Sequence, residues 1–144
     1  MWRELFEELG HGDLLQDPAS VQRIAETEAL LGHPIPASVR SFYAEMDGVV
    51  AGVLDGYQYG WSLDRLVQER RFERSPEWPW EELGPWEPRF RFGSDGCGND
   101  FFVRLDGDDT VFVWNYIDGA PYDIAPTLRD FWIGWIGEGP LGRW

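Results

Sequence analysis

The segment Asp95-Gly96-Cys97-Gly98-Asn99-Asp100 carries residue types that could bind a metal or act as a nucleophile. Oxygen atoms of Asp and Asn are ligands that Ca²⁺ prefers. The spacing departs from the calcium-loop template, because Cys97 and Asp100 stand where a ligand and the essential glycine belong. Glycine and asparagine also accept the positive φ angles of tight turns. We therefore expect a turn between strands here, and a solvated hairpin loop at Asp106-Gly107-Asp108-Asp109.

Nucleophilic catalysis by Cys97 would require a base that generates the thiolate. The chain has two histidines, His11 and His33, and both fall in or beside the N-terminal region. No Cys-His signature surrounds them, and one Cys with two His makes a poor zinc ligand set. We expect an unreactive thiol, no metal site and no cofactor.

A carboxylate on an apolar helical stripe, Glu28, has two interpretations. Burial could tune it as a general acid or base. It could equally accept hydrogen bonds from backbone donors at a neighbouring turn and hold the helix in place. The second interpretation is favoured, because no second carboxylate or histidine has a meaningful spacing from Glu28. Phosphate-binding loops, nucleophile elbows and kinase motifs are also absent. We therefore expect a protein without catalytic activity. The alternative, a hydrolase, would lose its activity when Glu28 or Cys97 is replaced.

Two Gly-containing segments combine aromatic and acidic residues in the manner of an interface hot spot with an acidic rim. They span residues 54–61 and 118–123. Packing beneath ordinary loops is the alternative, and the sequence leaves it open. With the acids of the turns, the candidate partner-binding residues are Asp55, Tyr57, Tyr59, Trp61, Asp95, Asp106, Asp108, Asp109, Asp118 and Tyr122.

The formal net charge of −14 excludes several classes of partner. Lysine is absent, so all twelve basic residues are Arg. A negative field repels phosphate backbones and anionic membranes, so we expect neither nucleic-acid nor membrane binding. The same field would steer a basic protein partner toward the chain. The acidity could also serve only to keep a Trp-rich protein in solution.

Length and cysteine content indicate one intracellular domain. The 144 residues fit a single domain, residues 1–144, that buries enough surface for its own core. A lone cysteine forms no disulfide within the chain, which favours a reducing compartment. The acidic start of the chain differs from a signal peptide, and no apolar stretch is long enough for a membrane helix. We expect a cytoplasmic monomer.

The first half of the chain shows helical periodicity. Residues 2–9 place apolar side chains on one face, and Gly10 suits the helix end. A second helix is expected from an Asp17 cap and Pro18 to Gly32, with Val21, Ile24, Ala25 and Leu31 facing inward. A third begins near Pro36, with Val39, Phe42, Tyr43 and Met46 at helical spacing before Gly48. Ser62 is expected to cap a fourth helix, Leu63 to Arg70.

The second half shows strand patterns. Strands are predicted for Val49 to Leu54, Tyr57 to Tyr59, Phe90 to Phe92, Phe101 to Leu105 and Thr110 to Tyr116. The last two form a hairpin through residues 106–109. On the last strand both faces are apolar, which predicts a central position covered by helices. A final helix runs from about Leu128 to Ile136, capped by Thr127. This order predicts an α+β fold, with a mainly antiparallel central sheet flanked by N-terminal helices and a C-terminal helix.

An ordered set of short patterns runs through residues 20–136. It contains Ile24, Glu28, Leu31-Gly32, Ile35-Pro36, Phe42-Tyr43, Asp47-Gly48, the segment from Phe92 to Asn99, Val111-Phe112-Val113-Trp114, and Leu128 to Phe131. The set resembles the SUKH superfamily, also called the Smi/Knr family. The chain departs from the family pattern at Ile35, where Leu is commoner, and at Asn115-Tyr116, where His is expected, which weakens any subfamily assignment.

The resemblance implies an α+β domain whose bacterial members are mostly immunity proteins of polymorphic or contact-dependent toxin systems. Such proteins bind and block a cognate toxin effector domain, often a nuclease or deaminase. Fungal relatives regulate cell-wall synthesis through protein contacts, so a non-catalytic scaffold or regulatory role is the alternative. Members of the family are not known as enzymes.

Overall fold

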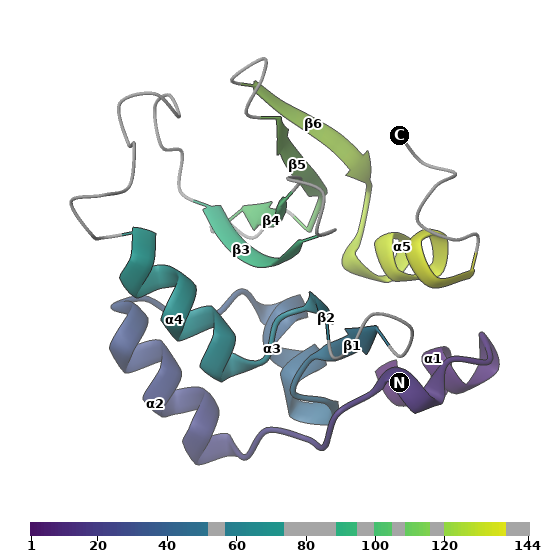
Figure 1. Ribbon diagram of the computed structural model, residues 1–144, viewed down its shortest axis with the longest axis horizontal. Helices are drawn as coiled ribbons and strands as arrows, with labels where there is room; N and C mark the ends of the chain where they lie inside the picture. Colours follow the sequence, from purple (N-terminus) through teal and green to yellow (C-terminus); the bar gives the residue numbers. More distant parts are fainter. Residues whose placement is uncertain (52–56, 74–88, 95–99, 105–108, 116–119, 138–144) are drawn as a thin grey trace.

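The computed structural model describes residues 1–51, 57–73, 89–94, 100–104, 109–115 and 120–137. In these residues, helices α1 (Trp2–Glu8), α2 (Val21–Leu31) and α3 (Ala37–Glu45) precede the first strand (Figure 1). Strands β1 (Val49–Ala51) and β2 (Tyr57–Gly60) lead to α4 (Leu63–Glu73). The chain then forms β3 (Arg89–Ser94), β4 (Asp100–Arg104), β5 (Val111–Asn115), β6 (Ala120–Ala125) and α5 (Leu128–Trp132). The predicted α+β class is confirmed.

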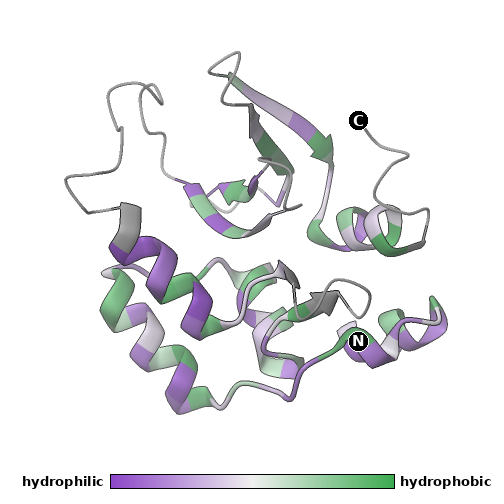
Figure 2. Ribbon diagram, viewed as in Figure 1, coloured by the Kyte–Doolittle hydropathy of each residue, from purple (hydrophilic) through white to green (hydrophobic). Residues whose placement is uncertain are grey.

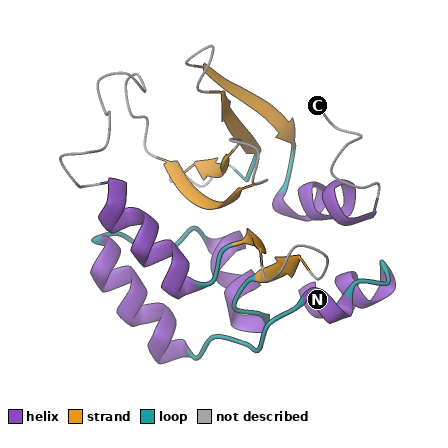
Figure 3. Ribbon diagram, viewed as in Figure 1, coloured by secondary structure: helices purple, strands orange, loops and turns teal. Residues whose placement is uncertain are grey.

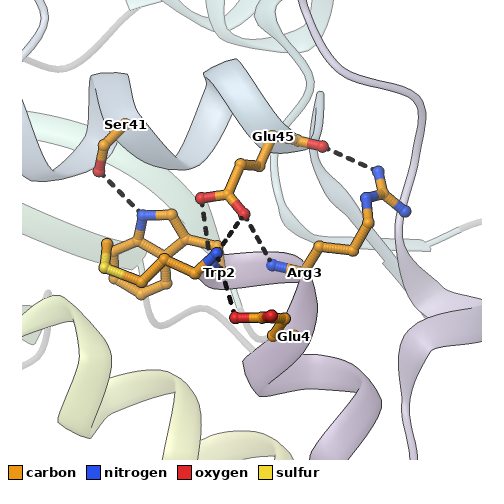
Figure 4. A network of polar contacts seen from close by, with 6 residues as sticks. Trp2, Arg3, Glu4, Ser41 and Glu45 are labelled. Atoms are coloured by element: carbon orange, nitrogen blue, oxygen red, sulfur yellow. Dashed lines mark hydrogen bonds and ion pairs between the residues drawn. The ribbon is translucent and has the colours of Figure 1, made fainter.

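Helix α1 begins at the predicted residue, and its amino end is held by Glu45 of α3 (Figure 4). The Glu45 carboxylate accepts hydrogen bonds from the terminal ammonium of Met1 and the N–H of Trp2, each at 3.0 Å, and from the N–H of Arg3 at 3.1 Å. The indole N–H of Trp2 donates to Ser41 Oγ at 2.9 Å. Because the first N–H groups of a helix have no partner within it, one acidic side chain satisfies the start of α1.

The cap predicted for α2 was wrong by three residues. Ser20, rather than Asp17, accepts the hydrogen bond from the N–H of Arg23 at 3.0 Å. The main chain of Asp17 instead accepts the N–H of Asp47 at 2.8 Å, which holds this segment against the end of α3. At the other end, Gly32 terminates α2 with φ of 80°, as expected of a left-handed cap.

The buried face of α2 also differs from the prediction. Ile24 and Leu31 are buried as expected, and so is Thr27, whose hydroxyl donates to the carbonyl of Arg23 at 2.8 Å. Val21 and Ala25 are exposed, so both were wrongly placed in the core. In α3, by contrast, Val39, Phe42 and Tyr43 are all buried.

The described strands form one antiparallel sheet in the order β1-β2-β3-β4-β5-β6 (Figure 3). The expected hairpin is confirmed, since β4 and β5 pair from Asp100 opposite Trp114 to Val103 opposite Val111. Strand β6 was not predicted, because Gly119-Ala120-Pro121 resembles a loop. Pro121 is tolerated there because β6 is the last strand of the order, and an edge strand does not need every N–H.

One face of the sheet packs on the helices and forms the main core. Phe92 of β3 and Phe101 of β4 meet Phe131 of α5 at ring-centroid distances of 5.6 and 4.8 Å. Trp132, completely buried, stacks on Phe42 at 5.4 Å and contacts Phe6 at 5.5 Å. Helices α1, α3 and α5 therefore converge on the same aromatic cluster, and hydrophobic residues alternate with hydrophilic ones along the elements around it (Figure 2).

The opposite face of the sheet carries a second, smaller cluster of Phe102, Phe112 and Trp114. The prediction that helices would cover both faces of β5 was wrong for the described residues. Guanidinium groups lie over this cluster instead. Arg89 lies 4.2 Å from the ring centroid of Trp114, and Arg104 lies 4.8 Å from that of Phe112. Arginine stems and cation–π contacts thus cover the apolar rings.

The two later helices begin at their predicted caps. Ser62 Oγ accepts the N–H of Arg65 at 3.2 Å, and Thr127 Oγ1 accepts the N–H of Asp130 at 3.0 Å. Helix α5 continues as a π-helical turn, η3 (Ile133–Gly137), which places Trp135 in the core against Phe101 at 5.0 Å. The last helix was predicted to run to about Ile136, and this length is confirmed. The change to π-helical geometry after Trp132 was not predicted.

Candidate protein interface

Strand β6 presents three consecutive exposed residues, Pro121, Tyr122 and Asp123. Tyr122 is 46% exposed and is one of few large hydrophobic side chains in the described part of the chain with that much exposure. The register places Tyr122 opposite Val113 and Asp123 opposite Phe112 of β5. These pairings put Tyr122 on the side of Val113 and Asp123 on the side of Phe112, so the two side chains lie on opposite faces of β6. An exposed aromatic ring with a polar tip is a side chain that protein interfaces favour.

Asp123 pairs with Arg104 of β4, two strands away across β5. Its Oδ1 lies 3.4 Å from Arg104 Nη2, and the Asp123 side chain remains 64% exposed. The same guanidinium group contacts the ring of Phe112, which limits its movement. Asp123 therefore carries an exposed carboxylate on the face of β6 opposite to Tyr122.

Two of the aromatic candidates serve packing. Trp61 is buried, and the guanidinium group of Arg91 lies 4.7 Å from the centroid of its ring. Its main chain is bound as well, since the Tyr43 hydroxyl donates to the Trp61 carbonyl at 2.7 Å. Tyr59 is half-buried and contacts Trp135 at 5.5 Å. A buried indole cannot anchor a partner, so Trp61 is removed from the candidate set; Tyr57 lies in β2, and its side chain is outside the described residues.

Among the acidic candidates, the structure describes Asp109. It is half-buried, and its Oδ2 lies 3.4 Å from the N–H of Leu128, at the start of α5. This contact gives Asp109 a structural role at the helix end. Asp55, Asp95, Asp106, Asp108 and Asp118 lie outside the described residues.

The strands that precede these acids in the sequence end at two opposite ends of the sheet. Because neighbouring strands are antiparallel, the carboxyl ends of β1, β3 and β5 lie at one end of the sheet, and the carboxyl end of β4 lies at the other. The ends of β1 and β5 are four strand spacings apart, or about 19 Å. The described strand ends that precede these acids in the sequence are therefore spread across the sheet.

Arginine side chains are largely bound within the protein. Ion pairs join Arg23 to Asp64, Arg40 to Glu28, Arg65 to Glu69, Arg91 to Glu69 and Asp100, and Arg104 to Asp123. Arg3 donates to the carbonyls of Gln16 and Glu45 at 3.0 and 2.8 Å. With twelve Arg against 26 acids in the whole chain, these pairs leave a large excess of negative charge for the surface.

Glu28 has the structural role that the sequence favoured. Its Oε2 accepts the N–H of Ile35 at 3.0 Å, across the turn between α2 and α3, and its Oε1 pairs with Arg40. The carboxylate thereby fixes the angle between the two helices. His33 lies near the same turn, and its ring contacts Phe90 at 6.2 Å.

The half-buried carboxyl of Asp47 has a pKa that its surroundings raise. Burial raises the pKa of Asp47, and the nearby Asp64 adds to this effect, while a hydrogen bond from the N–H of Leu63 at 2.8 Å opposes it. Burial, together with the charge of Asp47, also raises the pKa of the Tyr43 hydroxyl. Both groups bind backbone atoms, the N–H of Leu63 and the carbonyl of Trp61, so they join α3 to the start of α4.

Within the described residues, no group of three or more His, Cys, Asp or Glu side chains could hold a metal ion. None of the helices there combines the length and apolar character that a bilayer crossing requires. The arginine-covered cluster on the second face of the sheet was missed by sequence reasoning. Its signal was present, since Arg and aromatic residues occupy alternate positions at Arg89, Arg91, Phe102, Arg104, Phe112 and Trp114.

These features define an α+β domain with an antiparallel meander, an aromatic core beneath helices on one face and an exposed, acidic edge strand. A family model gives this class a name, since the model of the SMI1 / KNR4 family (SUKH-1) matches residues 18–133. The chain belongs to this family, as the sequence resemblance predicted. No curated protein compared with the chain matches it.

Proposed function

We propose that this chain is an immunity protein that binds a cognate bacterial toxin and neutralises it by covering its effector domain, without catalysis. The observation that carries the proposal is the family match over residues 18–133, because immunity proteins are the bacterial role that the resemblance implies. The toxin class, a nuclease or deaminase, and action in the reducing cytosol belong to the same proposal.

The negative charge of the chain supports the proposal that its partner is basic. Since so many arginines are bound to acids of the same molecule, the surface has few cations with which to attract an acidic protein. A toxin that acts on nucleic acid has a basic substrate-binding face, and a negative surface complements it. Binding there would exclude the substrate sterically and electrostatically.

Strand β6 supplies the part of the interface that the structure describes. Tyr122 can contribute buried area and a hydroxyl group to a contact. Asp123, on the other face of the same edge strand, can pair with Arg or Lys of a partner that encloses this edge. The five acids outside the described residues are proposed as further negative charges that attract the basic partner.

The test is a co-expression rescue in a sensitive host. The neighbouring gene is induced with and without this protein, and rescue of growth with co-purification of the two products supports the proposal. Tyr122→Ala should weaken the complex by more than about 1 kcal/mol if it is an anchor. Leu30→Ala is the matched control, because Leu30 is a similarly exposed apolar residue, 52% exposed, on α2.

A neighbour that is harmless, or that kills equally in both strains, would count against immunity. A pull-down from the native cell would then search for a regulatory partner, as in the fungal relatives. Rescue that survives Tyr122→Ala and depends on Leu30 would keep the function but move the interface from β6 to α2.

A further inference from the structure

We propose that an apolar groove between α2 and α3 binds a basic amphipathic helix of another protein. The α2–α3 groove, as we name it, is lined by Val21, Ile24, Ala25, Glu28, Arg40 and Ala44. Helices α2 and α3 lie apart from strand β6 (Figure 1). The inference therefore concerns a second surface of the molecule, and it goes beyond the proposed function without resting on it.

The apolar stripe of α2 continues from the core onto the surface at this groove. Val21 is 86% exposed and Ala25 is exposed as well, although helical periodicity predicts that both face inward. Ile24, between them in the sequence, is buried. Val21, Ala25 and Glu28 recur at helical spacing and so share one side of α2. Contiguous apolar surface that is left exposed marks interaction sites, whereas single exposed apolar residues do not.

The size and the walls of the α2–α3 groove favour side chains that a helix presents. Its volume is about 260 Å³. A cavity of about 150 Å³ holds one benzene molecule, so the groove accommodates roughly two groups of that size. Side chains three or four positions apart on a helix lie about 5–6 Å from each other and can enter together. Ala25 of α2 and Ala44 of α3 are both exposed, and their short side chains allow a third helix to approach closely.

The charge of this part of the chain selects a basic partner. Residues 2–45, which include α1, α2 and α3, contain eight Asp and Glu against three Arg. Each of these Arg side chains already binds carbonyl or carboxylate groups of the same molecule. In the groove itself, Arg40 pairs with Glu28, so the charges of the lining balance. Lys or Arg on the polar face of a bound helix would therefore meet an excess of carboxylates around a neutral groove.

The test uses a fluorescent peptide built only from Leu and Lys, about 20 residues long so that it can form a helix by itself. Leu occupies positions i, i+3, i+4 and i+7, which gives the helix one apolar face. Fluorescence anisotropy should show saturable binding of one peptide to each molecule of the intact protein. A peptide of the same composition with Leu spread around the helix should bind at least about tenfold more weakly, because it has the same charge without an apolar face.

Substitutions in the walls of the groove show where the peptide binds. Ala25→Gln places a longer polar side chain in the groove and should weaken binding by about tenfold or more, because its amide would be buried without a partner. Ala29→Gln is the matched control, since Ala29 is an exposed alanine of the same helix that does not line the groove. Ala44→Gln changes the opposite wall and should act as Ala25→Gln does. Gln is a good helix former, so these variants should fold.

Loss of binding in Ala25→Gln and Ala44→Gln, with binding retained in Ala29→Gln, supports the proposal. An absence of saturable binding by the wild-type protein, equal binding of the two peptides, or equal weakening in all three variants overturns it. Sedimentation of the protein alone tests a second copy as the occupant: a dimer that dissociates in Ala25→Gln would overturn the proposal as well. None of these results bears on toxin neutralisation, which the co-expression rescue measures separately.

Discussion

The side chain of Glu28 shows how one carboxylate fixes a helix–helix junction. It lies on α2, yet its hydrogen bond to the N–H of Ile35 reaches across the turn toward α3. Arg40 of α3 adds an ion pair, but Arg40 is half exposed, so this pair contributes little. Most of the stabilisation therefore comes from the backbone hydrogen bond of a carboxylate that is only 14% exposed.

Replacement of Glu28 by Ala should lower the free energy of unfolding by about 1–3 kcal/mol, because the N–H of Ile35 loses its partner. Urea unfolding measures the change. Glu26→Ala is the control, since Glu26 is exposed on the same helix and contacts Gln22 four residues earlier at 3.0 Å. Equal effects of the two substitutions would contradict the assigned role of Glu28.

The Glu45 carboxylate and the Met1 ammonium group predict stability that decreases at both ends of the pH range. Burial alone would raise the pKa of Glu45, but hydrogen bonds from the N–H of Trp2, the terminal ammonium and the N–H of Arg3 outweigh burial and lower it. The hydrogen bond to Glu45 is the main cause that raises the pKa of the Met1 ammonium above its ordinary 8.0.

The sign of each effect follows from linkage. Stabilisation by Glu45 is complete above its ordinary pKa of 4.5 and is lost as the pH falls through the lower folded value. Stabilisation by the Met1 ammonium is complete below 8.0 and is lost as the pH rises through the raised folded value. Urea unfolding across this range should show both losses, and Glu45→Gln should reduce both.

Acetylation of the terminal amine separates the two effects, because it removes the charge of Met1 and leaves Glu45 in place. The acetylated protein should lose the alkaline change in stability and keep the acidic one. An alkaline change that persists after acetylation would have to come from another group.

At the scale of elements, the shortest strand pairing in the described sheet is the one between β2 and β3. It consists of a single residue pair, Gly60 opposite Gly93. A Cβ atom at Gly93 would lie 1.9 Å from the carbonyl oxygen of Tyr59, much closer than any contact allows. Glycine is therefore required for β3 to approach β2, which explains Gly93 without any ligand.

Gly93→Ala should destabilise the protein by about 3 kcal/mol or more, because the atom that must move is backbone. Thermal unfolding of Gly93→Ala and Gly12→Ala provides the comparison. At Gly12 the close neighbour is the Glu7 side chain, which can rotate away, so a smaller effect is expected. Similar unfolding midpoints for the two variants would contradict the tight β2–β3 approach.

The elements that periodicity predicts well are those whose ends carry local signals. Gly32, Ser62 and Thr127 terminate or begin helices as their chemistry predicts. The start of α2 was misplaced because Asp17 and Ser20 are both good cap residues, and tertiary hydrogen bonds to α3 decide between them. Strand β6 was missed because its Pro and Gly neighbours are typical of turns, and only pairing with β5 identifies it.

The candidate interface was less predictable than the fold. Tyr122 and Trp61 have similar local sequence surroundings, with Gly and Asp nearby, yet one is exposed and the other is buried. The difference arises from tertiary packing of Arg91 and Tyr43 on Trp61, which no local pattern encodes. The ion pair between Arg91 of β3 and Glu69 of α4 likewise joins distant segments of the chain.

For the whole molecule, the net charge of −14 should speed association with the proposed basic partner. The rate of association with the proposed toxin should fall by about tenfold or more as salt rises from about 0.01 to about 0.15 M, because screening shortens the reach of the field. Stopped-flow mixing measures the rate, and a dissociation rate that changes little identifies steering as the cause.

Charge reversal tests which acids produce the steering. Asp55→Arg, Asp106→Arg and Asp108→Arg should each slow association and reduce its dependence on salt. Glu26→Arg is the control, because Glu26 is an exposed acid of α2, a helix that packs against α3 and α4. An association rate that changes neither with salt concentration nor with these charge reversals would exclude an electrostatic mechanism.

The two edges of the sheet have a consequence for the behaviour of this protein at high concentration. Exposed edge strands can pair with strands of other molecules and begin aggregation. Leu15 bridges to Val49 and covers β1, while Pro121 leaves β6 without one backbone donor. Each edge therefore presents fewer backbone groups to a growing intermolecular sheet, which lowers the tendency of this aromatic-rich chain to aggregate as its concentration rises.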